Sequence, residues 1–286
     1  MGEYHDLYVK TDVLLLADVF ENFRDVGIDK YSLDPIHYLT LPGYSWDAML
    51  KMTNIKIELS TDINEYQFLE RGKRGGVSMI ASLRHSVANN KYLSDYDKDK
   101  ANKFIIYLDA NNLYGGAMCE NLPHKLNGFQ DVPKDFDIMK WDDNVIDDEG
   151  NSYGCFLEVD LQYPKELHDL HNDLPVAPEN LIVTNEMLSK NQVRQRKMFN
   201  VSLDADGNLH ESKTKKLVPN LNDKNRHVLH YKNLQNYLSL GLKVKKYHKI
   251  LKFTQRQWLK QYIDKNTGFR KNAQNDFEKD FFKLMN

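Results

Sequence analysis

The sequence predicts an α+β fold, in which helices and strands occupy separate stretches of the chain. Apolar side chains recur with helical spacing over residues 6–24 and again near the C-terminus, whereas residues 154–163 and 242–253 have strand-like patterns. The 286 residues, 41% of them hydrophobic, supply enough apolar surface for one large domain or two ordinary ones. We therefore expect a globular protein.

The N-terminal part is predicted to be mainly helical. Within residues 6–24 the apolar stripe is formed by positions 7, 13, 16, 20 and 23. A short helix is expected around residues 46–52, after an irregular segment that contains two prolines and a glycine. The alternating stretch IKIEL at residues 55–59 predicts a strand.

The middle of the chain is predicted to contain strands. The apolar run FIIYL at residues 104–108 predicts a buried strand that ends at Asp109, and GCFLEVDLQY at residues 154–163 predicts a second one. The Asp-Gly pair within residues 202–212 is typical of a hairpin turn.

The C-terminal part begins with a predicted helix at residues 233–240, which ends at Gly241, and continues as a basic strand. The last forty residues predict a helical hairpin. Trp258, Tyr262 and Ile263 lie on one face of its first helix, and Gly268 is predicted to be the left-handed C-cap. Asn275, followed three residues later by Glu278, predicts the start of the second helix.

The net charge of -2 conceals two segments of opposite sign. From Lys213 onward there are 18 Lys or Arg against 5 Asp or Glu, which leaves 21 against 36 for the preceding residues. Such a basic segment is either a solvated face or a surface for phosphates, because clustered cations bind polyanions by releasing condensed counterions.

The cellular context is predicted to be intracellular. Cys119 and Cys155 cannot form the disulfide framework of a secreted protein, and the N-terminus has no signal-peptide pattern. No apolar run is long enough to cross a bilayer, so we expect no membrane partner. The nucleus and a viral or plasmid replication site are both compatible with these features.

Several possible sites carry little weight. DADGN at residues 204–208 has its glycine too early for a calcium loop, so we interpret it as a turn. His168 and His171, near Cys155 in the sequence, lack further ligands at zinc-site spacing. The sequence has no glycine-rich phosphate loop and no nucleophile elbow.

Asp109 is the main candidate for catalysis. An acid that ends a strand most often begins a turn, but a rigidly held carboxylate is also a ligand for divalent metals. The carbonyl of the next residue, Ala110, points into the same space. Two-metal phosphoryl transfer needs a second carboxylate from another strand.

The stretch YLDANNLYGGAM, residues 107–118, resembles motif A of family B DNA polymerases, usually written DxxSLYPS, in the form used by protein-primed enzymes and Maverick or Polinton transposons. The resemblance implies that Asp109 and the Ala110 carbonyl bind two Mg²⁺ ions. It also implies that Tyr114 lies under the incoming sugar and excludes a 2′-hydroxyl. The usual Ser, Pro and Ser are replaced by Asn112, Gly115 and Gly116.

Three further matches follow the order of that family. YVKTD at residues 8–12 resembles the third exonuclease motif and implies roles for Tyr8 and Asp12. KRGG at 73–76 resembles the template-contacting YxGG element, with Lys73 in place of Tyr, and implies DNA binding by Arg74, Gly75 and Gly76. KLMN at 283–286 resembles the start of motif B, KxxxNSxYG.

The motif B resemblance assigns nucleotide binding to Lys283 and to a second lysine, Lys271, twelve residues earlier. In one continuous helix these lysines would lie about 18 Å apart, too far for one triphosphate. A helix start at Asn275 leaves Lys271 in the turn and removes this objection.

The family resemblance implies four segments in a partial polymerase, with an incomplete palm built on an antiparallel sheet. Residues 1–60 are the tail of the exonuclease domain, 61–103 the connector, 104–252 the palm with an insertion, and 253–286 the start of the fingers. The two other exonuclease motifs and motif C, with its second catalytic Asp, are expected beyond the two ends. We expect a fragment that is inactive alone.

The implied partners are a DNA primer-template, deoxynucleoside triphosphates and, for protein priming, a terminal protein. One alternative is a non-catalytic nucleic-acid-binding module that uses residues 213–286 and binds DNA with steep salt dependence. Another is a structural remnant of a transposon or viral polymerase that binds nothing.

Overall fold

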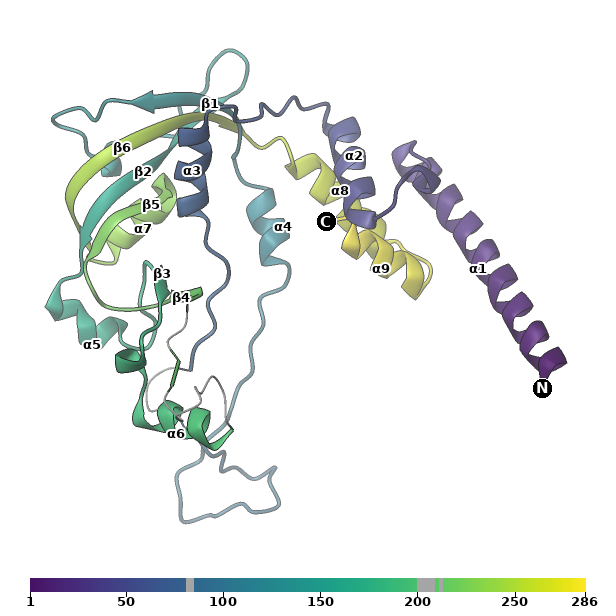
Figure 1. The fold of residues 1–286 in the computed structure, drawn as a ribbon, viewed down its shortest axis with the longest axis horizontal. Helices are drawn as coiled ribbons and strands as arrows, with labels where there is room; N and C mark the ends of the chain where they lie inside the picture. Colours follow the sequence, from purple (N-terminus) through teal and green to yellow (C-terminus); the bar gives the residue numbers. More distant parts are fainter. Residues whose placement is uncertain (81–84, 200–208, 211–212) are drawn as a thin grey trace.

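The computed structural model describes residues 1–80, 85–199, 209–210 and 213–286, and it confirms an α+β fold (Figure 1). The helices are α1 (Gly2–Tyr31), α2 (Leu41–Thr53), α3 (Ile63–Gly72), α4 (Leu113–Met118), α5 (His168–His171), α6 (Lys190–Met198), α7 (Tyr231–Ser239), α8 (Lys260–Lys271) and α9 (Asp276–Leu284). The strands are β1 (Leu122–Gln130), β2 (Ser152–Gln162), β3 (Glu179–Ile182), β4 (Lys215–Val218), β5 (Lys224–His230) and β6 (Lys243–Arg256).

The main sheet has the strand order β1-β6-β2-β5, and every neighbouring pair is antiparallel. At its centre Phe156 of β2 lies opposite Leu251 of β6 and His230 of β5. The strands curl, as Figure 1 shows, and β5 is an edge of the sheet. A second, two-stranded sheet pairs β3 with β4.

The alternation of side chains along β2 gives the sheet two covered faces. Leu157, Val159 and Leu161 are fully buried in a core that includes Leu234 of α7. Phe156 faces the other way and packs in a smaller cluster with Phe68 of α3. The sheet is therefore sandwiched between α7 on one face and α3 on the other.

A second hydrophobic core joins helices that are far apart in sequence. Its buried members are Tyr31, Tyr44, Ala48, Met49, Leu259, Tyr262, Ile263, Phe281, Phe282 and Met285. They come from the end of α1, from α2 and from the α8–α9 hairpin. Figure 1 shows these helices beside the sheet, with the first part of α1 projecting away.

Most of the predicted elements are confirmed. Residues 154–163 correspond to β2, residues 233–240 to α7, and the basic segment 242–253 lies in β6. Gly241 has a left-handed φ of 101°, as expected after a helix end. Asn275 caps α9 by accepting a hydrogen bond from the Glu278 backbone N–H at 2.9 Å.

Two predicted strands are wrong. Residues 55–59 run alongside β1 through one bond, from the Glu58 N–H to the His124 carbonyl at 3.0 Å, but they form no strand. Residues 104–108 have no regular structure, and their side chains are exposed. An apolar run becomes a strand only when a neighbouring strand takes its backbone hydrogen bonds, and no described segment does so here.

The prediction for Gly268 is also wrong, because α8 continues through it to Lys271. The helix predicted at residues 6–24 is confirmed within α1, but only Phe23 of its apolar stripe joins the helical core. Leu7, Val13 and Leu16 are exposed. The hairpin predicted over residues 202–212 and the DADGN turn fall largely outside the described residues.

Gly154 of β2 and Gly268 of α8 differ in the space that is available to a side chain. A Cβ at Gly154 would lie 2.3 Å from the ring of Phe253, whereas one at Gly268 has nothing within 4 Å. We expect Gly154→Ala to lower the free energy of unfolding by about 1–3 kcal/mol through overpacking. Gly268→Ala should raise it by about 0.5–1 kcal/mol, because alanine is the better helix former. Urea unfolding followed by circular dichroism tests both, and equal effects of the two changes would contradict this packing.

Candidate functional site

The loop that leads into α4 carries the candidate catalytic residues. Asp109 and Ala110 lie in an irregular, exposed segment directly before the helix. The Asp109 carboxylate makes no hydrogen bond or ion pair with any residue that the structure describes. Among the described residues, the backbone around it is held by the Asn89–Lys103 bridge on the preceding side and by the start of α4 on the other.

Asn112 and Gly115 form the turn into α4. Asn112 has a left-handed φ of 53°, and its side-chain oxygen accepts a hydrogen bond from the Gly115 N–H at 3.2 Å. A Cβ at Gly115 would lie only 2.1 Å from the Asn112 side-chain nitrogen. A side chain at residue 115 would therefore displace the capping Asn112 side chain, and a proline there would lack the N–H that the cap binds.

Tyr114 lies on the first turn of α4 with 80% of its surface exposed. Its phenol has no hydrogen-bond partner in the described part of the chain. The end of α4 is anchored, because Met118 and Cys119 pack against the helical core. Tyr114 is thus a presented side chain on an anchored helix and not a core aromatic.

Lys271 and Lys283 are exposed, and neither forms an ion pair within the described ranges. Lys271 is the last residue of α8 and not part of the turn, which corrects the expected helix end. The Tyr262 hydroxyl donates to the Met285 carbonyl at 2.7 Å, and Phe269 contacts Phe282, so α9 runs back along α8. Because the chain reverses direction between the two helices, Lys271 and Lys283 lie on the order of 5–10 Å apart when measured along the α8 axis.

Tyr8 and Asp12 lie four residues apart on α1 and are both exposed. Residues four apart share one face of a helix. Figure 1 shows this part of α1 projecting away from α4, so the structure does not bring Tyr8 and Asp12 to Asp109.

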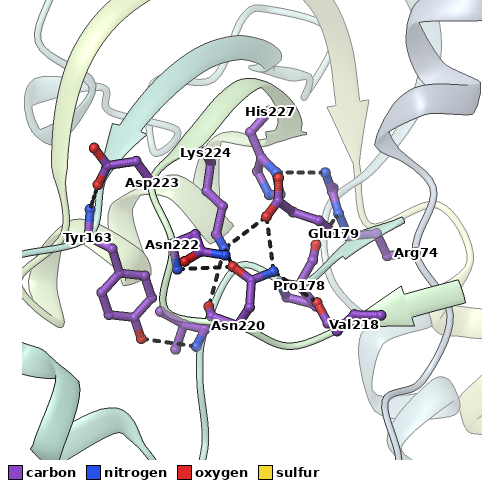
Figure 2. A network of polar contacts seen from close by, with 11 residues as sticks. Arg74, Tyr163, Pro178, Glu179, Val218, Asn220, Asn222, Asp223, Lys224 and His227 are labelled. Carbon is purple, nitrogen blue, oxygen red and sulfur yellow. Dashed lines mark hydrogen bonds and ion pairs between the residues drawn. The ribbon is translucent and has the colours of Figure 1, made fainter. Parts of the chain in front are cut away.

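Arg74 is directed into the protein, as Figure 2 shows. Its guanidinium donates to the carbonyls of Pro178 at 3.1 Å and Val228 at 2.6 Å, and its Nη2 lies 3.3 Å from Nδ1 of His227. The next residues, Gly75 and Gly76, are exposed, and no atom would contact a Cβ at either. Arg74 thus fixes the connector to β5, while the two glycines leave their backbone open.

A buried lysine lies at the start of β5. The Lys224 ammonium is fully buried and donates to Glu179 at 3.0 Å and to the Asn220 carbonyl at 3.2 Å (Figure 2). Burial lowers the pKa of Lys224, and the hydrogen bond to Glu179 opposes that shift. The ion pair therefore attaches the β3–β4 sheet to the edge of the main sheet.

Glu158 was not predicted as a site residue. Its side chain is 1% exposed, and its two oxygens accept from Arg71 at 2.7 Å and Arg226 at 3.3 Å. The sequence signal was an acid within the apolar strand FLEVDL, on the face opposite to Leu157 and Val159. Its partners are distant in sequence, so no local pattern identifies them.

The described residues do not form a two-metal site on their own. No three His, Cys, Asp or Glu side chains gather as metal ligands within them. Asp109 is a single carboxylate, which does not hold two ions. Of the histidines considered for zinc, His171 binds the Tyr163 hydroxyl at 2.8 Å, and His168 lies 3.4 Å from the Tyr163 carbonyl.

No protein-family model matches this chain, and no curated protein is similar to it. Among solved structures, Phi29 DNA polymerase in an orthorhombic crystal form is similar over 87% of this chain, with a TM-score of 0.44 and 13% sequence identity. The chain spans 35% of the length of that polymerase. A similarity of this size is distant and establishes no common family.

Within the described ranges, no helix combines the length and the apolar character that crossing a membrane requires.

His227 provides a test of the buried network around Arg74. Burial lowers its pKa to about 3, with the charges of Arg74 and Lys224 acting in the same direction. The unfolded chain takes up the proton near pH 6.5, so this contribution to stability is present above that pH and is lost as the pH falls toward 3. His227→Asn keeps an acceptor for Arg74 but does not titrate. We expect it to lose less stability than the parent protein between pH 6.5 and 4.5.

The measurement is urea unfolding at both pH values, with the exposed His5→Asn as the matched control. The difference between the parent protein and His227→Asn should be on the order of 1 kcal/mol per pH unit. Identical pH dependence in all three proteins would show that His227 is not buried in its neutral form.

Proposed function

We propose that this chain is part of a DNA-directed DNA polymerase of family B, of the protein-primed type, and that it supplies the first catalytic carboxylate, Asp109. The observation that carries the proposal is the loop before α4. Asn112 and Gly115 are used to build the turn, whereas Asp109 and Tyr114 bind nothing within the described chain. The residues to which the motif assigns chemistry are those left open for substrate.

The order of the motif-like stretches supports the same proposal. The exonuclease-like Tyr8 and Asp12, the connector glycines, the Asp109 loop and Lys283 follow one another as in that family. In the proposed role the Asp109 carboxylate and the Ala110 carbonyl would be ligands for Mg²⁺, which supplies the charge that two-metal phosphoryl transfer needs. A second carboxylate is required to complete the site. The proposed substrates are a primer-template and deoxynucleoside triphosphates, with a terminal protein as the priming partner.

The proposed segments are related by packing as well as by order. The exonuclease-tail segment 1–60 and the fingers segment 253–286 share the helical core. The connector 61–103 contributes α3 to one face of the sheet in the palm segment 104–252. The four segments are therefore defined by the order of the motifs. They are not separately folded units, because they share hydrophobic cores.

The second candidate is a nucleic-acid-binding module without catalysis. The basic residues from Lys213 onward favour it, because this segment contains 18 Lys or Arg and only 5 Asp or Glu. Both candidates bind DNA with strong salt dependence. The two candidates differ in what they predict for a change at Asp109. Only the polymerase proposal predicts that nucleotide incorporation is lost while DNA binding is retained.

The Asp109→Asn variant tests the catalytic role in the chain expressed with the coding sequence that flanks it in its gene. We expect loss of magnesium-dependent primer extension, because the amide keeps size and hydrogen bonding but removes the negative charge. DNA affinity, measured by fluorescence anisotropy, should remain within about twofold, since the variant changes one charge and leaves all 18 Lys and Arg after residue 212 in place. Equal extension by variant and parent would remove Asp109 from the active site.

The Tyr114→Val variant tests substrate selection in the same longer protein. If the phenol ring lies beneath the incoming sugar, its loss should raise ribonucleotide relative to deoxyribonucleotide incorporation by about tenfold or more. Tyr114→Phe keeps the ring and should keep the discrimination. A ratio that is unchanged in a folded Tyr114→Val protein would assign Tyr114 a structural role only.

A further inference from the structure

An apolar cavity lies between α3 and the main sheet. Its volume of about 430 Å³ is typical of small-molecule sites. The walls come from the segment before α3, from α3 itself and from three strands of the sheet, and their apolar members include Ile57, Leu69, Leu126, Phe156 and Val228. Elements that are far apart in the sequence therefore build this cavity together.

Charged side chains stand at the rim of the cavity. Lys73, Lys125 and Glu58 line it, and each is more than half exposed. The Lys125 ammonium lies 4.0 Å from the Glu58 carboxylate, and Lys73 binds Glu70 of α3. Exposed ion pairs of this kind contribute little to stability, so both lysines remain able to bind an anion.

The cavity keeps a small excess of positive charge. Arg74 also lines it, and this guanidinium donates to the carbonyls of Pro178 and Val228 but forms no ion pair within the described ranges. With Glu70 counted, three cations meet two carboxylates. An excess of one charge fits a single acidic group, whereas a polyanion gains its affinity from many cations.

His230 lines the cavity without adding charge. Its Nδ1 accepts a hydrogen bond from the Lys232 N–H at 3.3 Å, so the proton of the neutral ring lies on Nε2. Burial lowers the pKa of His230 to about 4, and the charge of Lys232 acts in the same direction. The ring is therefore neutral at pH 7, and the positive charge of the described lining comes from Lys73, Arg74 and Lys125.

Two neighbouring hollows differ from this cavity in charge. Arg74 and Val228 also line a basic groove of about 610 Å³ on the other side of the connector. Between α1 and α9 lies an apolar groove of about 300 Å³, and Asp280 is the single charged residue among its described lining. Its walls include Leu16, Phe20 and Phe281. An apolar anion is disfavoured beside Asp280 and favoured beside Lys73 and Lys125.

The geometry points to a binding site for a small amphipathic acid, with its apolar body between α3 and β1 and its single carboxylate or sulfonate beside Lys73 and Lys125. The apolar walls remove the body of the ligand from water, while the acidic group stays at the solvated rim. This inference goes beyond the proposed polymerase function and does not depend on it, because binding requires neither a nucleotide nor a metal ion.

The test compares two fluorescent probes that share one aromatic body, the anion anilinonaphthalene sulfonate and the neutral phenylnaphthylamine. Lys125→Gln should weaken binding of the sulfonate to this chain about threefold, and Glu58→Gln should strengthen it about threefold, because each variant changes one charge at the rim. Both variants should bind the neutral probe as the parent does. Lys134→Gln removes an exposed lysine in a loop after β1 and should change the affinity of neither probe.

Hydrogen exchange locates the bound sulfonate. The probe should slow amide exchange in residues 57–60, which form one wall and are joined to β1 by the bond from the Glu58 N–H to the His124 carbonyl at 3.0 Å. Slower exchange in residues 16–23 instead would place the probe in the α1–α9 groove and overturn the assignment. Equal effects of Lys125→Gln and Lys134→Gln, or release of the sulfonate by oligo-dT at matched ionic strength, would also overturn it.

Discussion

The buried carboxylate of Glu158 attaches α3 to the edge strand of the sheet. One of its oxygens binds Arg71 of α3 and the other binds Arg226 of β5. Loss of one partner of a fully buried ion pair costs about 3–5 kcal/mol, and the half-exposed arginines here place the cost below that range. The position of α3 on the sheet depends on this contact together with the packing of Phe68 against Val228 and Leu251.

The two cavities beside the connector follow from where α3 ends. Gly72 passes close to β5, since a Cβ there would lie 3.1 Å from the Val228 side chain. Arg74 then returns to the same strand through the Val228 carbonyl. The chain is thereby held over the sheet edge between an apolar cavity on one side and a basic groove on the other.

Sequence patterns predicted the elements that local chemistry determines. The alternation in β2, the glycine after α7 and the Asn275 cap are each encoded within a few residues, and all are present. Residues 104–108 were mispredicted because strand formation depends on a partner elsewhere, which an apolar run does not reveal. Gly268 was mispredicted because a glycine at a possible helix end does not show whether the next turn continues.

The candidate site was predicted only in part for the same reason. The motif-like stretch singled out Asp109 and Tyr114, but Asp109 was expected at the end of a buried strand and lies instead in an exposed irregular segment. The contacts between Glu158 and its arginines span 87 and 68 residues, and no periodicity connects them. Arg74 was predicted as a DNA contact from its place beside two glycines, but its side chain is committed to the carbonyls of Pro178 and Val228.

The asparagine cap of α4 has a consequence for how this loop could have changed during descent. Asn112 occupies the space that a side chain at residue 115 would need, so a larger residue there would move the Asn112 side chain and break its cap. The two positions are therefore expected to covary among relatives, because the cap couples the side chain at one to the backbone at the other.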